Sequence, residues 1–210
     1  MGLFDSIKKQ VNDIAREVGG PELGNQVSKM TAGGETAVKN MINSAKNKSE
    51  SVVFDRIPTT LEEFKTLPQA ALSTPFDTAA LTVVALSFYP KDRELCFAML
   101  QEISGPRQIS QAEKQFINDR FMDKDYVPRS FFNGATPQND YTPSTPYTIV
   151  VSENPYSYAD DGYAKLFLKS GGADSERAVQ LRKAKDGKWY LWEQFLLSDI
   201  RKPESTNPWA

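Results

Sequence analysis

The side chains that could carry acid–base chemistry in this sequence are carboxylates. The 210 residues include no histidine and one cysteine, Cys96, which lies in an apolar helical pattern typical of a buried side chain. Catalytic triads, cysteine–histidine pairs and histidine-ligated metals are therefore excluded for this sequence. The carboxylates that remain, in predicted turns or at a strand end, are Asp160, Asp161, Asp174, Glu193 and Asp199. Two carboxylates at a suitable separation can hydrolyse a glycosidic bond, so a carboxylate-dependent hydrolase is one candidate function.

Nucleotide-binding motifs are missing from the sequence. Neither G-x-x-x-x-G-K-[ST] nor G-x-G-x-x-G occurs. The tetrapeptide Lys169-Ser170-Gly171-Gly172 resembles a phosphate-binding loop, but it joins two predicted strands and no helix follows it, which favours a hairpin loop. We therefore expect no cofactor and no metal, and a protein that is not an enzyme.

The strongest candidate for a binding surface is an aromatic-rich loop at 126–141. Prolines within and around it forbid a regular helix, and Asn133-Gly134 is a turn signal. Long ordered loops are uncommon unless they are functional, and aromatic rings beside a guanidinium are typical of binding hot spots. The predicted binding residues, one of them on the last strand, are Tyr126, Arg129, Phe131, Phe132, Asn133, Tyr141 and Trp192. Alternatively, the rings fill the gap between helices and sheet, and Arg129 pairs with a carboxylate such as Asp125 or Glu193.

Residues 1–50 are predicted to form an amphipathic helical arm. Its apolar stripe, with alternating spacings of three and four, consists of Phe4, Ile7, Val11, Ile14 and Val18. Short helices of this kind are marginal in water unless the apolar face is buried. We therefore expect the stripe to bind a protein partner or to mediate self-association. Acidic residues balance the basic ones along the arm, which argues against a membrane surface.

The order of helix and strand signals predicts an α+β fold. Capping patterns at Thr60, Thr74 and Ser110 and a helix opened by Pro90 predict a helical layer within 52–122. Strand patterns follow at 147–152, 163–169, 178–183 and 189–193, and Asp186-Gly187 predicts a two-residue hairpin between the last two. The predicted architecture is a helical layer followed by an antiparallel meander of about four strands. The domains would be an arm at 1–50, an α+β domain at 52–203 and a tail at 204–210.

Charge and hydropathy restrict the partners and the compartment. The formal net charge is −2 and neither end of the chain concentrates positive charge, so we expect no nucleic-acid partner. The longest apolar-rich stretch, 79–89, is about half the ~20 residues that a transmembrane helix needs. No secretory signal pattern is visible at the start. We therefore expect a cytoplasmic protein.

Long strings in the C-terminal two-thirds carry a family resemblance. They are STPFDTAA at 73–80, DYVPRSFF at 125–132, NDYTP at 139–143, YAKLFLKSGGADS at 163–175 and KWYLWEQFLLSDIR at 188–201. Over about 70–203 the chain resembles an uncharacterised family of bacterial proteins defined only as a domain of unknown function, and this resemblance implies no activity. The Asp-Gly turn before Lys-Trp-Tyr-Leu also resembles the last hairpin of nuclear-transport-factor-2-like cones, an alternative architecture. The function expected from the sequence is a non-enzymatic cytoplasmic binding or assembly module that uses the aromatic loop and the arm.

Overall fold

The structure, a computed structural model, describes residues 48–206 and 208. All of them except Lys48 belong to the second of the two units into which the chain divides, Ser49–Ala210. The predicted arm lies outside the described residues apart from its last three positions, and so does its stripe of Phe4, Ile7, Val11, Ile14 and Val18. Two of those last positions, Ser49 and Glu50, already belong to a strand.

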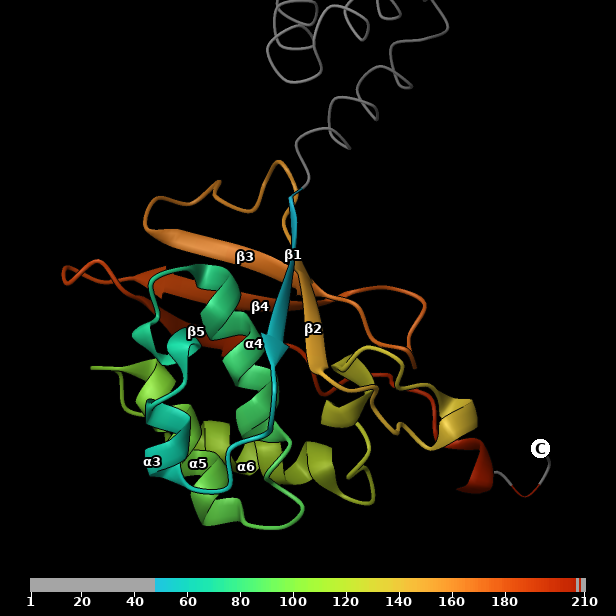
Figure 1. Cartoon of the computed structure of the whole chain (residues 1–210). Helices are drawn as coiled ribbons and strands as arrows, with labels where there is room; N and C mark the ends of the chain where they lie inside the picture. Colours follow the sequence, from blue (N-terminus) through green and yellow to red (C-terminus); the bar gives the residue numbers. More distant parts are fainter. Residues whose placement is uncertain (1–47, 207, 209–210) are drawn as a thin grey trace, which may run out of the picture. The chain divides into compact units, whose positions relative to one another are not determined.

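A five-stranded antiparallel sheet forms the β layer (Figure 1). Its strands lie side by side in chain order, and they are β1 (Ser49–Phe54), β2 (Tyr147–Ser152), β3 (Tyr163–Leu168), β4 (Arg177–Lys183) and β5 (Trp189–Gln194). The predicted α+β class and meander are confirmed, with strand β1 added at one edge. This strand was not predicted because only two of its residues, Val52 and Phe54, face the core. Its partner β2 lies far along the chain, with Val52 opposite Ile149.

Four α-helices lie on one side of this sheet (Figure 1). They are α3 (Leu61–Lys65), α4 (Pro75–Leu86), α5 (Arg93–Ser104) and α6 (Gln111–Phe121), accompanied by the 3-10 helices η1 (Pro68–Ala71), η2 (Pro128–Phe131), η3 (Pro137–Asn139) and η4 (Glu204–Thr206). The predicted caps Thr60, Thr74 and Ser110 each accept a backbone N–H three residues further on. Helix α5 starts later than predicted, because its N-cap is Asp92 and not Pro90. Within the described chain, no helix is both long enough and apolar enough to cross a bilayer.

Helix α4 forms the centre of the hydrophobic core. It contacts all five strands, and every residue from Thr78 to Leu86 is buried. A helix that is covered on all sides is mostly apolar all round, which explains why threonines are the only polar residues from Thr78 to Leu86. The buried hydroxyl of Thr78 donates to the Trp189 carbonyl (2.7 Å), and that of Thr82 donates to the Thr78 carbonyl (2.8 Å).

The β4–β5 hairpin turns through three residues, 185–187, so the predicted two-residue turn is wrong. The Gly187 N–H donates to the Ala184 carbonyl (3.0 Å), and the Ala184 N–H donates to the Lys188 carbonyl (2.9 Å). Gly187 has a φ of 83°, as expected for the residue that follows a type I turn in a three-residue hairpin loop. The Asp-Gly pair therefore marks the turn, whereas the loop length depends on how the two strands pair.

Candidate functional site

The predicted aromatic loop is part of the core. Tyr126, Phe131, Phe132 and Tyr141 are each at most 4% exposed. Tyr126 stacks on Tyr141 with 5.4 Å between ring centroids, and the Tyr141 hydroxyl donates to the Arg201 carbonyl (2.6 Å). These rings therefore attach the C-terminal segment to the domain, and they do not present aromatic faces to a partner.

Arg129 and Asn133 are the two polar residues predicted in the same loop. Arg129 forms no ion pair with a described residue, so its predicted pairing with Asp125 or Glu193 is wrong, and its Nε is buried without a hydrogen-bond partner there. Asn133 is exposed, and its backbone N–H donates to the Thr148 carbonyl (2.8 Å). None of the three cavities described below is lined by a loop residue.

The tetrapeptide 169–172 supports this loop. The Ser170 hydroxyl donates to the Ser130 hydroxyl (2.7 Å), and the Gly171 N–H donates to the Ser130 carbonyl (2.8 Å). Gly172 lies so close to the Tyr141 hydroxyl and Ile200 that a Cβ would collide with both. The tetrapeptide thus lies in the connection between β3 and β4, as predicted, and it also holds the aromatic loop in place.

A groove follows strand β5, the edge strand opposite β1, where it meets the segment that joins α5 to α6. Two cavities that share Ser104, Arg107 and Leu191 form this β5 groove. The cationic cavity, of about 340 Å³, is lined by Ser104, Pro106, Arg107, Arg182, Lys183, Ala184, Lys185, Tyr190, Leu191 and Trp192. The phenylalanine cavity, of about 520 Å³, is lined by Leu100, Ser104, Arg107, Ile109, Ala112, Glu113, Phe116, Ile117, Arg120, Leu191, Glu193, Gln194, Phe195 and Ser198. A third cavity, of about 480 Å³, shares Tyr190 with the cationic cavity.

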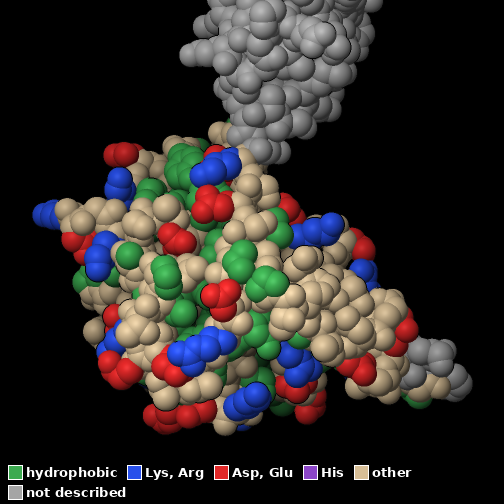
Figure 2. Space-filling model, in the orientation of Figure 1, with side chains coloured by type: hydrophobic (Ala, Val, Ile, Leu, Met, Phe, Trp, Pro, Cys, Tyr) green, Lys and Arg blue, Asp and Glu red, His purple; other side chains and the backbone are tan. Residues whose placement is uncertain are grey.

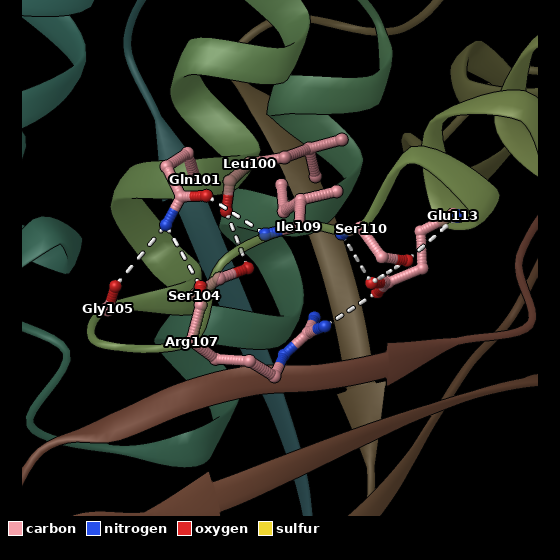
Figure 3. Close-up of polar contacts among 8 residues, drawn as sticks. All are labelled: Leu100, Gln101, Ser104, Gly105, Arg107, Ile109, Ser110 and Glu113. Carbon is pink, nitrogen blue, oxygen red and sulfur yellow. Dashed lines mark hydrogen bonds and ion pairs between the residues drawn. The ribbon is translucent and has the colours of Figure 1, made fainter.

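Gln101 on helix α5 fixes the backbone of the α5–α6 segment (Figure 3). Its side-chain NH₂ donates to the carbonyls of Gly105 (3.3 Å) and Arg107 (3.0 Å), and its oxygen accepts the Ile109 N–H (3.0 Å). One amide thus satisfies three backbone groups in the segment that joins α5 to α6. Arg107 is thereby held at a defined position beside strand β5.

Gly105 lets this segment approach strand β5 closely. Its φ is +59°, and an added Cβ would collide with the ring of Tyr190. The Tyr190 hydroxyl in turn donates to the Asp186 carboxylate (2.7 Å). This hydrogen bond raises the pKa of Tyr190 to about 12 and lowers the pKa of Asp186, so tyrosine and carboxylate form a stable pair at neutral pH.

Arg107 and Glu113 point toward each other across the groove wall (Figure 3). The Arg107 guanidinium donates to Glu113 (2.7 Å), and Glu113 also accepts the Ser110 N–H and hydroxyl (2.9 Å each), which completes the capping box of α6. Partial burial opposes ionisation of Glu113, but the hydrogen bonds from Ser110 and Arg107 outweigh it and lower the pKa. Glu113 is therefore a carboxylate at neutral pH, and it is not the proton donor that the hydrolase alternative requires.

Trp192 lies in the wall of the cationic cavity, half-buried, and it contacts two guanidiniums. Its ring centroid is 5.6 Å from the Cζ of Arg107 and 4.7 Å from the Cζ of Arg182. The ring also packs edge-on against Tyr163, with 5.8 Å between centroids. A β-bulge explains its position, because Gln180 pairs with Glu193 while Leu181 pairs with Leu191, so Trp192 is the extra residue. Of the seven predicted binding residues, Trp192 is the one that lines a described cavity.

The phenylalanine cavity has exposed aromatic rings at its rim. The side chains of Phe116 and Phe195 are 42% and 44% exposed, and the Arg120 guanidinium lies 5.0 Å from the ring centre of Phe116. Exposed rings of this size beside a cavity are typical of binding surfaces. Its two arginines and two glutamates balance in number, in contrast to the cationic cavity, whose lining includes no carboxylate.

The other predicted carboxylates lie at the surface. Asp160 and Asp161 are exposed in the loop before β3, and so is Asp199. Asp174 forms an ion pair with Arg201 (2.7 Å), and the hydrogen bond from Arg201 lowers the pKa of Asp174. Among residues 48–206 no group of three or more Asp, Glu or Cys side chains is placed to hold a metal ion.

Fold and sequence together define the class as an α+β domain with helices packed on one face of an antiparallel meander. The chain belongs to the family of the domain of unknown function DUF6935, whose model matches residues 56–204. This confirms the family resemblance. No curated protein matches the chain, and no solved structure matches it, so the nuclear-transport-factor-2-like alternative gains no support.

Proposed function

We propose that this protein is a non-enzymatic binding or assembly module and that its binding surface is the β5 groove. The observation that carries the proposal is Trp192, a half-buried ring in a cavity wall that two guanidinium groups contact. Tryptophan and arginine are the residues that most often dominate binding energy at interfaces. The groove replaces the aromatic loop in this role, because the rings of the loop are buried.

The walls of the groove are fixed before any partner arrives, which favours tight binding. Gln101, the capping box at Ser110 and the Tyr190–Asp186 hydrogen bond each hold one part of it. A preformed site loses less conformational entropy on binding than a site that must first become ordered. The proposal also places the protein in the bacterial cytoplasm, with a protein as partner.

Site-specific photo-crosslinking in the native cell tests this proposal. A benzophenone amino acid would replace Lys183 or Phe195 in the groove, and Gln138 or Asp161, both exposed outside the groove, as matched controls. We expect a discrete adduct of defined mass from both groove positions and none from the controls. The proposal would be contradicted if the groove positions gave no adduct, or if the control positions gave adducts in equal amount.

Self-association through the apolar stripe of the arm is the second part of the proposal, and it rests on the sequence pattern. Light scattering of the full chain should give a mass above that of one 23.5 kDa chain. A variant with Val11→Asp and Ile14→Asp should scatter as a monomer, whereas a variant with Lys8→Gln should keep the larger mass. A monomeric wild-type chain at all concentrations tested would refute this part alone.

A further inference from the structure

The two cavities of the β5 groove differ in charge. Arg107, Arg182, Lys183 and Lys185 line the cationic cavity, and of these Arg107 alone is in an ion pair with a described residue. The nearest carboxylate in sequence, Asp186, accepts hydrogen bonds from the Tyr190 hydroxyl and the Lys188 N–H and does not line the cavity. Figure 2 shows one face of the molecule, on which side chains of both signs are interspersed. Cations are therefore concentrated in the cationic cavity beyond what the net charge of −2 would suggest.

The guanidiniums of this cavity are held in place but still have donors available. The indole of Trp192 contacts both Arg107 and Arg182. Arg107 donates one N–H to Glu113, and the exposed Arg182 is in no ion pair with a described residue. A guanidinium fork matches the two oxygens of a carboxylate, and a fork held by an aromatic ring loses little freedom when it binds. These features favour an oxyanion, and a carboxylate above all, as the group bound in the cavity.

The phenylalanine cavity continues directly from the cationic one, because Arg107 and Leu191 line both. Its rim exposes Phe116 and Phe195, which are suited to contact a large apolar side chain. A small anion would fill the first cavity and leave these rings in water. A peptide segment that carries an acidic residue near a large apolar residue would fill both.

From this charge complementarity we propose that the β5 groove binds a partner-protein segment in which Asp or Glu residues occupy the cationic cavity and a neighbouring large apolar residue occupies the phenylalanine cavity. This inference rests on the proposed function and specifies the chemistry of the partner. Attraction between the unpaired cations and the acidic residues would steer the encounter and make binding sensitive to salt.

Selection from a random twelve-residue peptide library, with the full-length protein as bait, tests the inference. We expect enriched sequences to combine one or two acidic residues with a large apolar residue. The best peptide would then be measured by fluorescence anisotropy. Arg182→Gln should weaken its binding about tenfold, because it removes a charge-assisted hydrogen bond. Phe195→Ser should weaken it by a similar factor, and Lys165→Gln, an exposed cation outside the groove, should not change it.

Several outcomes would overturn the inference. Enrichment of neutral peptides would refute the inference, and so would an affinity that Arg182→Gln leaves unchanged. Groove adducts in the crosslinking experiment would still support the proposed function in either case. Complete displacement of the peptide by 10 mM inorganic phosphate would assign the cavity to small anions. Binding of a single-stranded oligonucleotide with higher affinity than the best peptide would also refute it. Arg182 is exposed, so circular dichroism should show that the variant folds normally.

Discussion

The aromatic loop and the β5 groove contain the same kinds of residues and use them differently. Both contain aromatic rings and an arginine. In the loop, Tyr126 and Tyr141 are covered by the C-terminal segment and donate hydrogen bonds to the carbonyls of Ile200 and Arg201. In the groove, Trp192 is half-buried, and the exposed guanidinium of Arg182 beside it is in no ion pair with a described residue. Composition therefore does not show whether aromatic rings are buried or lie at the surface, whereas the presence of a covering segment does.

The largest expected effect on stability comes from removing a buried ring of the aromatic loop. Tyr141→Ala should lower the free energy of unfolding by about 3–5 kcal/mol, because it leaves a cavity in the core and removes the hydrogen bond to Arg201. Trp192→Ala, the matched change in the groove, should cost about 1–2 kcal/mol because its ring is half-buried. Urea unfolding followed by circular dichroism measures both. Equal losses of unfolding free energy in the two variants would mean that the aromatic loop and the groove do not differ in burial as described.

The next effect tests the close approach between the α5–α6 segment and strand β5. Gly105→Ala should destabilise the protein by about 2–3 kcal/mol, since the residue has a positive φ and its Cβ would collide with Tyr190. Gly187→Ala is the comparison, because Gly187 also has a positive φ and its Cβ would meet open space, whereas Gly105 combines a positive φ with a ψ of −125° and the nearby ring. Gly187→Ala should cost about 1 kcal/mol, from the backbone conformation alone. Thermal unfolding of both variants gives the comparison, and a Gly105 variant as stable as the Gly187 variant would contradict the contact.

A smaller effect isolates the amide that positions Arg107. Gln101→Ala should cost about 1–2 kcal/mol, because three backbone groups of the α5–α6 segment lose their partner. Gln108→Ala is the control, since Gln108 lies exposed in the same segment. The NMR signal of the Trp192 indole should shift in the first variant and stay unchanged in the second. An unchanged indole signal in Gln101→Ala would show that Arg107 does not depend on this amide.

Local signals in the sequence predicted much of the fold, and contacts over long sequence separations account for what was missed. The caps Thr60, Thr74 and Ser110 are local, and each was predicted correctly. Strand β1 depends on pairing with β2, and the bulge that places Trp192 depends on the pairing of β4 with β5. Both lie beyond what a short window of sequence can specify.

The candidate site was harder to predict than the fold. Trp192 was selected for its residue type, but its partner Arg107 lies 85 positions earlier, and no pattern in the sequence connects the two. The aromatic loop was selected on similar grounds, and it is buried because residues near 200 fold back over it. Burial of a ring depends on a covering segment, and the sequence does not show which segment covers which ring.

The smallest expected effect is a difference in acid sensitivity between the two regions. The pKa of Glu113 is lowered from its ordinary value of 4.5, so between the two values the unfolded chain binds a proton that the folded chain does not. Stability from Glu113 is therefore present above about pH 4.5 and is lost as the pH falls through the lowered pKa. Glu113 is partly exposed and solvent screens its pairs, so this contribution is below about 1 kcal/mol. The Tyr141 hydroxyl, whose pKa burial raises to about 12, does not titrate in acid.

Acid should consequently loosen the groove wall and leave the aromatic loop intact. Hydrogen exchange would compare the protection factors of the Ser110 amide, which donates to Glu113, and the Asn133 amide, which donates to the Thr148 carbonyl. On going from pH 6 to pH 3, we expect protection to fall at Ser110 and to hold at Asn133. In Glu113→Gln the Ser110 amide should already be less protected at pH 6 and should change little with pH. A parallel fall at both amides in the wild-type protein would show that acid destabilises the whole domain and that the Glu113 hydrogen bonds do not set the acid response of the groove.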